Sequence, residues 1–152
     1  MEFEFKTTIN RPLEDVFAFF RDVDQYGGWK GSIVPVFDKT TPGPVRIGTR
    51  YYEVVQILPF VTGKVFTEVI GFETNKRLAY KFVALGMEGA LIYLFQTTHP
   101  EITEVVQKQR LLPRGMLRLF EPIIGALFSW MAKRRLSGIK SLLESERGRG
   151  NQ

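Results

Sequence analysis

The sequence predicts an α+β domain in which an antiparallel sheet of about seven strands is covered by one long C-terminal helix. Three observations predict this class: a helical apolar stripe near the end of the chain, a run of strand-like stretches before it, and one strand with two helices at the start. The expected order is strand, two helices, six strands and helix. We expect a single domain over residues 1–146 and a frayed tail over residues 147–152.

The predicted C-terminal helix covers residues 122–144, a length of about 35 Å at 1.5 Å per residue. Its apolar residues recur at steps of three or four positions, as one face of a helix requires. In its first half, Ile123 and Trp130 leave almost no polar side, so this part must be covered from more than one direction. The stripe consists of Ile124, Phe128, Ala132, Leu136, Ile139 and Leu143.

The middle of the chain is rich in β-branched and aromatic residues, broken by short turns. Connections this short imply antiparallel neighbours in a meander. A sheet with one apolar face needs a cover, and the long helix is the only predicted element large enough. A small-ligand space can open between the two. The predicted strands are residues 33–38, 49–58, 62–73, 77–84, 88–98 and 103–112.

The start of the chain alternates in the manner of a half-buried strand over residues 2–7. Asn10 and Pro12 then favour the beginning of a helix. A second, short helix is expected around residues 24–29, interrupted by Gly27 and Gly28. The stripe of the first helix is Leu13, Val16, Phe17, Phe20 and Val23.

The composition excludes several kinds of chemistry. The 152 residues include no cysteine and one histidine, His99, in a predicted turn. Disulfides, thiol catalysis and zinc–thiolate sites are therefore excluded, and neither a Ser–His–Asp triad nor a metal site is expected. We expect no cofactor. The 44% hydrophobic content, with 13 Phe, is enough for a core or an apolar cavity.

The formal net charge of +5 arises largely near the C-terminus, where Lys133, Arg134 and Arg135 are consecutive. These residues indicate a solvated helix face rather than an acidic partner. Nucleic-acid binding is not expected, because the strands lack interleaved aromatic and basic residues. There is no 18-residue apolar run and no signal-peptide pattern, so we expect a cytoplasmic protein without a membrane span. Oligomeric state stays open.

Several segments, taken in order, resemble the START-like (SRPBCC) superfamily, and within it the polyketide cyclase/dehydrase and lipid-transport group. They are INRPLEDVF at residues 9–17, RDV at 21–23 with Tyr26 and Trp29, VRIGT at 45–49, NKRLAY at 75–80, and residues 136–144. The resemblance implies the helix-grip (START/Bet v 1-like) fold over nearly the whole chain, in which a curved antiparallel sheet of about seven strands wraps around the long C-terminal helix. Gly27 and Gly28 depart from it where family members often continue a short helix.

The candidate site residues are polar groups on the expected inner face of the sheet and apolar residues of the helix. In the strand at 103–112, Lys108 and Arg110 should face outward, which turns Gln107 and Gln109 inward. Two inward glutamines need partners: each other, water or a ligand. The expected ligand-contacting set is Tyr52, Tyr80, Tyr93, Gln107, Gln109, Ile124, Leu127, Phe128 and Met131.

Glu68 and Tyr80 are the candidate catalytic groups. If Phe66, Ile70 and Phe72 point inward, Glu68 lies in an apolar cavity and can act as an acid or base. If that face is outward, Glu68 pairs with Lys64 and has no such role. Glu53 presents the same two alternatives.

Binding of a small hydrophobic molecule (a lipid, polyketide or quinone-like compound) between sheet and helix is the leading functional interpretation. One alternative is a cyclase or dehydratase that uses a cavity carboxylate and tyrosine groups. A second is an interaction module in which Trp130 and Arg134 dock on a partner or an anionic membrane surface.

Overall fold

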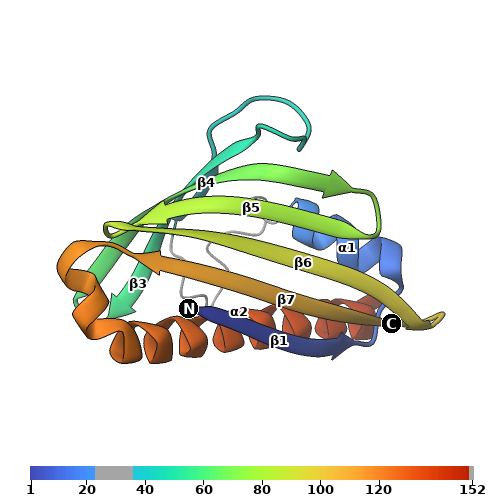
Figure 1. Ribbon diagram of the computed structural model, residues 1–152. Helices are drawn as coiled ribbons and strands as arrows, with labels where there is room; N and C mark the ends of the chain where they lie inside the picture. The colour runs from blue at the N-terminus through green and yellow to red at the C-terminus, as the bar shows by residue number, and fades with distance from the viewer. Residues whose placement is uncertain (23–35, 151–152) are drawn as a thin grey trace.

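The computed structural model describes residues 1–22 and 36–150 and contains one seven-stranded antiparallel sheet (Figure 1). The strand order across the sheet is β1-β7-β6-β5-β4-β3-β2, so β2 to β7 form a meander and β1 joins its far edge. The strands are β1 (Glu2–Ile9), β2 (Val36–Lys39), β3 (Arg50–Leu58), β4 (Val61–Glu73), β5 (Arg77–Ala84), β6 (Met87–His99) and β7 (Ile102–Pro113).

A 3-10 helix, η2 (Gly115–Phe120), leads into the long helix α2 (Glu121–Gly150). Pro122 lies in the first turn of α2, where its missing N–H costs no hydrogen bond. The helix continues beyond the predicted end at residue 144. The predicted stripe is confirmed, because its later members are buried against the sheet: Ala132, Leu136, Ile139 and Leu143.

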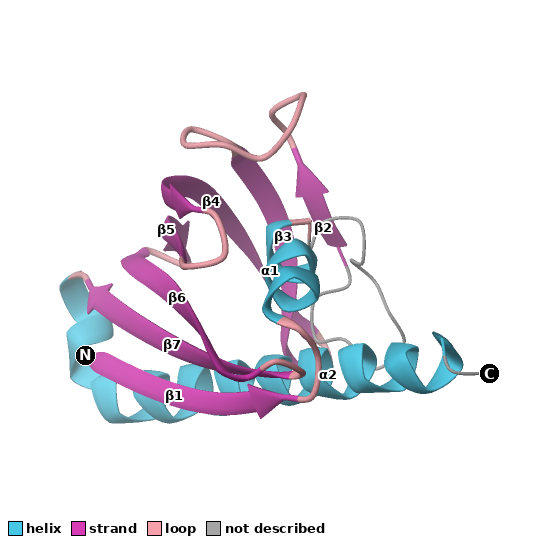
Figure 2. Cartoon of the chain, turned by 90° about the vertical axis from the view of Figure 1, so that its right-hand side faces the viewer, coloured by secondary structure: helices cyan, strands magenta, loops and turns pink. Residues whose placement is uncertain are grey.

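The sheet bends around α2. Figure 2 shows β1 alongside the helix, the middle strands arching away from it, and β3 returning towards it. The shorter helix α1 (Leu13–Arg21) closes one end of the enclosed space. This is the helix-grip arrangement that the resemblance predicts, with the apolar face of the sheet turned towards the helix.

The main core is aromatic. Phe17 and Phe20 of α1 pack edge-on against Phe95 of β6, each with ring centroids 5.3 Å apart. Such pairs are worth about 0.5–1.5 kcal/mol each beyond the area they bury. Phe20 also contacts Tyr93 at 4.8 Å. These contacts hold α1 against the sheet at the end that it closes.

Strand β1 ties the start of the chain to its end. Its register on β7 runs from Glu2 opposite Arg110 to Ile9 opposite Thr103. The Met1 amino group donates to the Leu111 carbonyl, 110 positions away in sequence, at 3.0 Å. The edge of the sheet thus depends on segments from both ends of the chain.

Two predictions fall wholly or partly outside the described residues. The second helix, around residues 24–29, lies outside them, as does the first part of the strand predicted at 33–38, whose remainder is β2. In the described part of the chain, no helix is both long enough and apolar enough to cross a membrane.

Candidate ligand-binding site

A cavity of about 130 Å³ lies between the sheet and α2. Its walls come from β3 to β7 on one side and from α2 on the other, and Phe20 of α1 contributes at the closed end. Alternation along the strands places every second side chain in it, while the stripe of α2 supplies the opposite wall. The α2 residues are Leu127, Phe128, Met131, Ala132, Arg135 and Ile139.

One part of the cavity is apolar and reaches the surface. Val55, Val65 and Leu91 line it from the sheet, opposite Leu127. Leu85, in the β5–β6 turn, also lines it and is 50% exposed. The cavity therefore meets solvent at the end of the molecule opposite α1.

The other part contains a largely buried ion pair between Glu53 of β3 and Arg135 of α2. The guanidinium Nη2 of Arg135 lies 3.5 Å from Oε1 of Glu53, and the side chains of Arg135 and Glu53 are 21% and 7% exposed. Burial alone would lower the pKa of Arg135, but the Glu53 carboxylate and the neighbouring tyrosines outweigh it, so the pKa is raised. The guanidinium stays charged and is compensated inside the cavity.

Two tyrosines stand beside this pair. The rings of Tyr80 and Tyr93, from β5 and β6, meet edge to face at 6.2 Å. Burial raises the pKa of both phenols, that of Tyr80 well above its ordinary value of 10.0, and the Glu53 carboxylate acts in the same direction. Both hydroxyls are therefore protonated at neutral pH and can donate hydrogen bonds.

The glutamines of β7 complete the polar part. Gln107 is 3% exposed, and its Nε2 donates to Oε1 of Gln109 at 3.4 Å. Its own Oε1 is buried without a hydrogen-bond partner among the described residues. A buried amide oxygen without a partner costs about 1–3 kcal/mol. Because the Gln107 side chain lines the cavity, a rotation of its amide would turn this acceptor towards a donor group placed there.

The raised tyrosine pKa values predict a loss of stability in alkaline solution. Above pH 10.0, the unfolded chain releases the phenolic protons of Tyr80 and Tyr93, whereas the folded chain retains them. The folded state then binds more protons, so the free energy of unfolding must fall as the pH rises. Urea titrations at increasing pH should show this fall, and a flatter profile for the Tyr80→Phe/Tyr93→Phe double variant. An equally steep profile in the double variant would contradict this assignment.

Most of the sequence-predicted contact residues gather around this cavity. Tyr80, Tyr93, Gln107 and Gln109 line it from the sheet, and Leu127, Phe128 and Met131 line it from α2. Ile124 lies one turn earlier and packs on the neighbouring cluster around Phe82 and Leu111. Whether these side chains touch a ligand stays a prediction.

Tyr52 and Glu68 lie on the outer face of the sheet instead. The Tyr52 ring contacts the exposed Phe66 at 5.4 Å. Glu68 forms ion pairs with Arg50 at 3.0 Å and Lys81 at 3.1 Å. Hydrogen bonds from Lys81 and then Arg50 lower its pKa, the opposite of the raised value expected for a cavity acid. Glu68 therefore provides no cavity carboxylate.

The sequence pattern assigns Arg135 to a solvated face, and the structure corrects this. A signal for the inward position is present: Phe128, Ala132, Arg135 and Ile139 follow the i, i+4, i+7, i+11 spacing of one helix face. Glu53 has a similar signal, since it alternates with Tyr51 and Val55, both of which are buried. Each charge is tolerated inside because the other neutralises it.

Within residues 1–22 and 36–150, no group of three histidine or carboxylate side chains is placed to hold a metal ion. Among the described residues, the polar side chains that line the cavity are one compensated ion pair, two phenols, two amides and the hydroxyl of Thr67, an arrangement suited to hydrogen bonding with an uncharged molecule.

Comparison with solved structures supports the fold. The Zhui aromatase/cyclase from Streptomyces sp. R1128 superposes with a TM-score of 0.82 at 12% identity, covering 95% of this chain and 93% of the other. A START superfamily protein from Mycobacterium smegmatis gives 0.75 at 12% identity, covering 95% and 97%. The di-domain aromatase/cyclase StfQ, from the steffimycin biosynthetic pathway, gives 0.75 at 14% identity, covering 97% of this chain and 46% of that one.

No protein-family model and no curated protein matches the chain. The chain has the START-like helix-grip fold, shared with aromatase/cyclases and START proteins. Its cavity occupies the space between the bent sheet and the long helix of that fold.

Proposed function

We propose that the protein binds a compact, uncharged, mostly apolar molecule that carries a hydrogen-bond donor, such as a phenol or a small cyclic alcohol. The observation that carries the proposal is Gln107, a residue that lines an otherwise largely apolar cavity and whose buried Oε1 has no hydrogen-bond partner among the described residues. A ligand hydroxyl would satisfy this acceptor while its hydrocarbon part contacts Leu91, Leu127 and Phe128.

The size of the cavity limits the ligand. A volume of about 130 Å³ is close to that of an engineered protein cavity of about 150 Å³ that holds benzene. A single ring or a short branched chain fits these walls as they stand. Larger lipids and multi-ring polyketides require the walls to move apart.

The charges in the cavity favour an uncharged ligand. Arg135 is the cationic side chain that lines it, and Glu53 compensates that charge at 3.5 Å. An anionic ligand would have to compete with Glu53 for the guanidinium and would also be repelled by that carboxylate. The two protonated tyrosines offer hydrogen bonds without adding charge.

Filling the cavity should abolish binding. Ala132 is 7% exposed and lines the α2 wall, so Ala132→Phe places a ring where the ligand would lie. We expect at least about a tenfold loss of affinity for benzyl alcohol, measured by displacement of an apolar fluorescent dye, because the ring removes the apolar contact area. The matched control is Ala126→Phe, on the exposed side of the same helix.

Mass spectrometry of gently purified protein, supplemented with toluene or benzyl alcohol, tests whether the ligand must carry a hydrogen-bond donor. The proposal expects benzyl alcohol to bind more tightly than toluene, because only the alcohol can donate to Gln107. The proposal is contradicted if the protein binds toluene and benzyl alcohol with equal affinity. It is also contradicted if the Ala132→Phe variant binds benzyl alcohol as tightly as the parent does.

A cyclase or dehydratase activity is the second candidate. Its support is the structural similarity to the Zhui aromatase/cyclase together with two phenols held protonated inside the cavity, where they can act as proton donors. Turnover of a cyclisable polyketide-like substrate that is lost in Tyr80→Phe/Tyr93→Phe, with binding retained, would favour this candidate over binding alone.

A further inference from the structure

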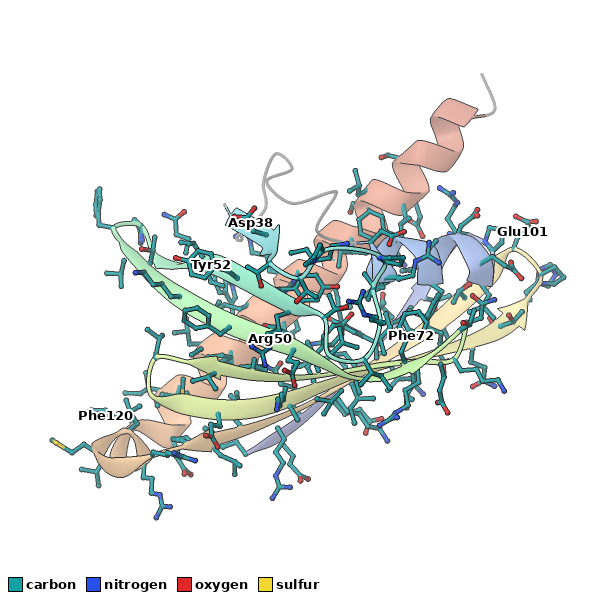
Figure 3. All side chains as sticks on the ribbon, turned by 90° about the horizontal axis from the view of Figure 1, so that it is seen from above. Asp38, Arg50, Tyr52, Phe72, Glu101 and Phe120 are labelled. Carbon is teal, nitrogen blue, oxygen red and sulfur yellow. The ribbon has the colours of Figure 1, made fainter. Side chains whose placement is uncertain are left out.

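We propose that the end of the molecule formed by the β3–β4 turn, the β5–β6 turn and η2, continued by the first turns of α2, docks on the surface of an anionic lipid bilayer. We call this region the apolar end. Figures 1 and 3 both place these connections at the end of the molecule opposite α1, and Figure 3 shows the β5–β6 turn between the β3–β4 turn and η2.

Large apolar side chains are exposed at this end of the molecule. Phe60 in the β3–β4 turn is fully exposed, and Met116, Leu119 and Ile123 are 78%, 77% and 67% exposed. Single exposed apolar residues are ordinary, but a concentration of them at one end marks an interaction site. Phe120, which Figure 3 places at the same end, is 49% exposed.

The exposed apolar residues project from separate short segments of the chain. They occupy a tight turn, a 3-10 helix and a helix start rather than one flat face (Figure 3). Side chains that project from separate connections can each enter the boundary between lipid headgroups and acyl chains. A second copy of the chain would need a continuous, complementary surface instead.

Basic side chains accompany the exposed apolar residues. Arg118 lies among the exposed apolar residues of η2, and Arg114, just before it, has a side chain 67% exposed while paired with Glu88. Further along the exposed side of α2, the Arg134 guanidinium stacks on Trp130 at 5.3 Å, beside Lys133. Apolar side chains rimmed by tryptophan and basic residues are typical of contact with anionic lipid. A symmetric dimer through this end would bring the same cations together.

Docking of the apolar end on a bilayer would bring the cavity close to the lipid. Leu85 belongs to the apolar end and also lines the cavity, so a docked molecule would present the cavity opening to the bilayer. The docking itself does not depend on ligand binding, and either proposal can fail while the other holds.

Flotation with lipid vesicles tests the inference on the full chain without ligand. We expect binding to phosphatidylcholine vesicles that contain phosphatidylglycerol, weaker binding to phosphatidylcholine alone, and weakening by added salt. The variant Phe60→Ser/Leu119→Ser/Ile123→Ser should lose at least about tenfold in partitioning, because the inserted apolar area is removed. All three residues are exposed, so folding should be retained, which circular dichroism can verify.

The matched control is Ile47→Ser, which removes a residue 63% exposed in the β2–β3 connection, away from the apolar end. It should bind vesicles as the parent does. The inference is overturned if the triple variant partitions like the parent. It is also overturned if the parent does not bind anionic vesicles but forms a dimer that the triple variant loses, since the apolar end would then be an interface between copies.

Discussion

Replacing Arg135 with leucine should lower the free energy of unfolding by about 3–5 kcal/mol, the usual result of removing one partner of a buried ion pair. The Glu53 carboxylate, 7% exposed, would then lie in the cavity without its guanidinium. The cost comes mainly from this uncompensated charge, because leucine packs well against an apolar wall. Chemical denaturation of parent and variant measures the change directly.

A second variant separates the ion pair from general damage to the helix. Glu53→Gln/Arg135→Leu removes both charges and should recover most of the lost stability. Arg134→Leu, one position earlier on the exposed side of α2, should change stability by about 0.5 kcal/mol or less. If the double variant is as unstable as the sum of its single changes, Glu53 and Arg135 are not energetically coupled.

Glu53→Gln alone should change which ligands the cavity accepts. The substitution leaves the Arg135 charge in the cavity without the carboxylate at 3.5 Å. A carboxylate ligand can then take its place, and one hydrogen bond between charged groups corresponds to about a tenfold to hundredfold gain in affinity. We expect benzoate, which the parent should bind poorly, to overtake benzyl alcohol in the variant.

Glu68→Gln is the control for this experiment. It removes the same charge from the neighbouring strand, but on the outer face of the sheet, where Glu68 pairs with Arg50 and Lys81. Dye displacement by benzoate and benzyl alcohol should match the parent. A similar gain of benzoate affinity in both variants would show that net charge, rather than the cavity pair, sets the preference.

The order of elements and the covered face of α2 are predictable from the sequence because they depend on local periodicity. The alternation along β7 is enough to place Gln107 and Gln109 on the inner face of the sheet. That strand has clear outward markers in Lys108 and Arg110, both of which are exposed.

The face of Glu68 is not predictable from the sequence, and the reason is a β-bulge. Phe66, Glu68, Ile70 and Phe72 form one alternating set, yet the register with β5 shifts between Val69 and Gly71. Phe66, before the shift, and Ile70, within it, are exposed, whereas Phe72, beyond the shift, packs against the core and meets Phe17 edge-on. A bulge exchanges the two faces of a strand, and nothing in the alternation alone reveals it.

The ion pair between Glu53 and Arg135 is also not predictable from the sequence, but the reason is different. Glu53 and Arg135 are 82 positions apart in the sequence. Taken alone, a glutamate or an arginine is ordinarily expected at a solvent-exposed position. Only the packing of α2 across β3 makes burial of both acceptable. Local pattern can place such residues on a face but does not supply the distant partner that permits the burial.

The pairing of β1 with β7 has a consequence for the order in which the protein folds. Met1 meets Leu111 across 110 positions, so this edge requires closure of nearly the whole chain, whereas the β4–β5 and β5–β6 hairpins form from neighbours. The cavity lies between α2 and strands β3 to β7, so it also exists only after segments far apart in the sequence have come together. A ligand therefore has nothing to bind until α2 has packed on the sheet. If that packing follows the rate-limiting step of folding, ligand binding should slow unfolding while leaving the folding rate nearly unchanged.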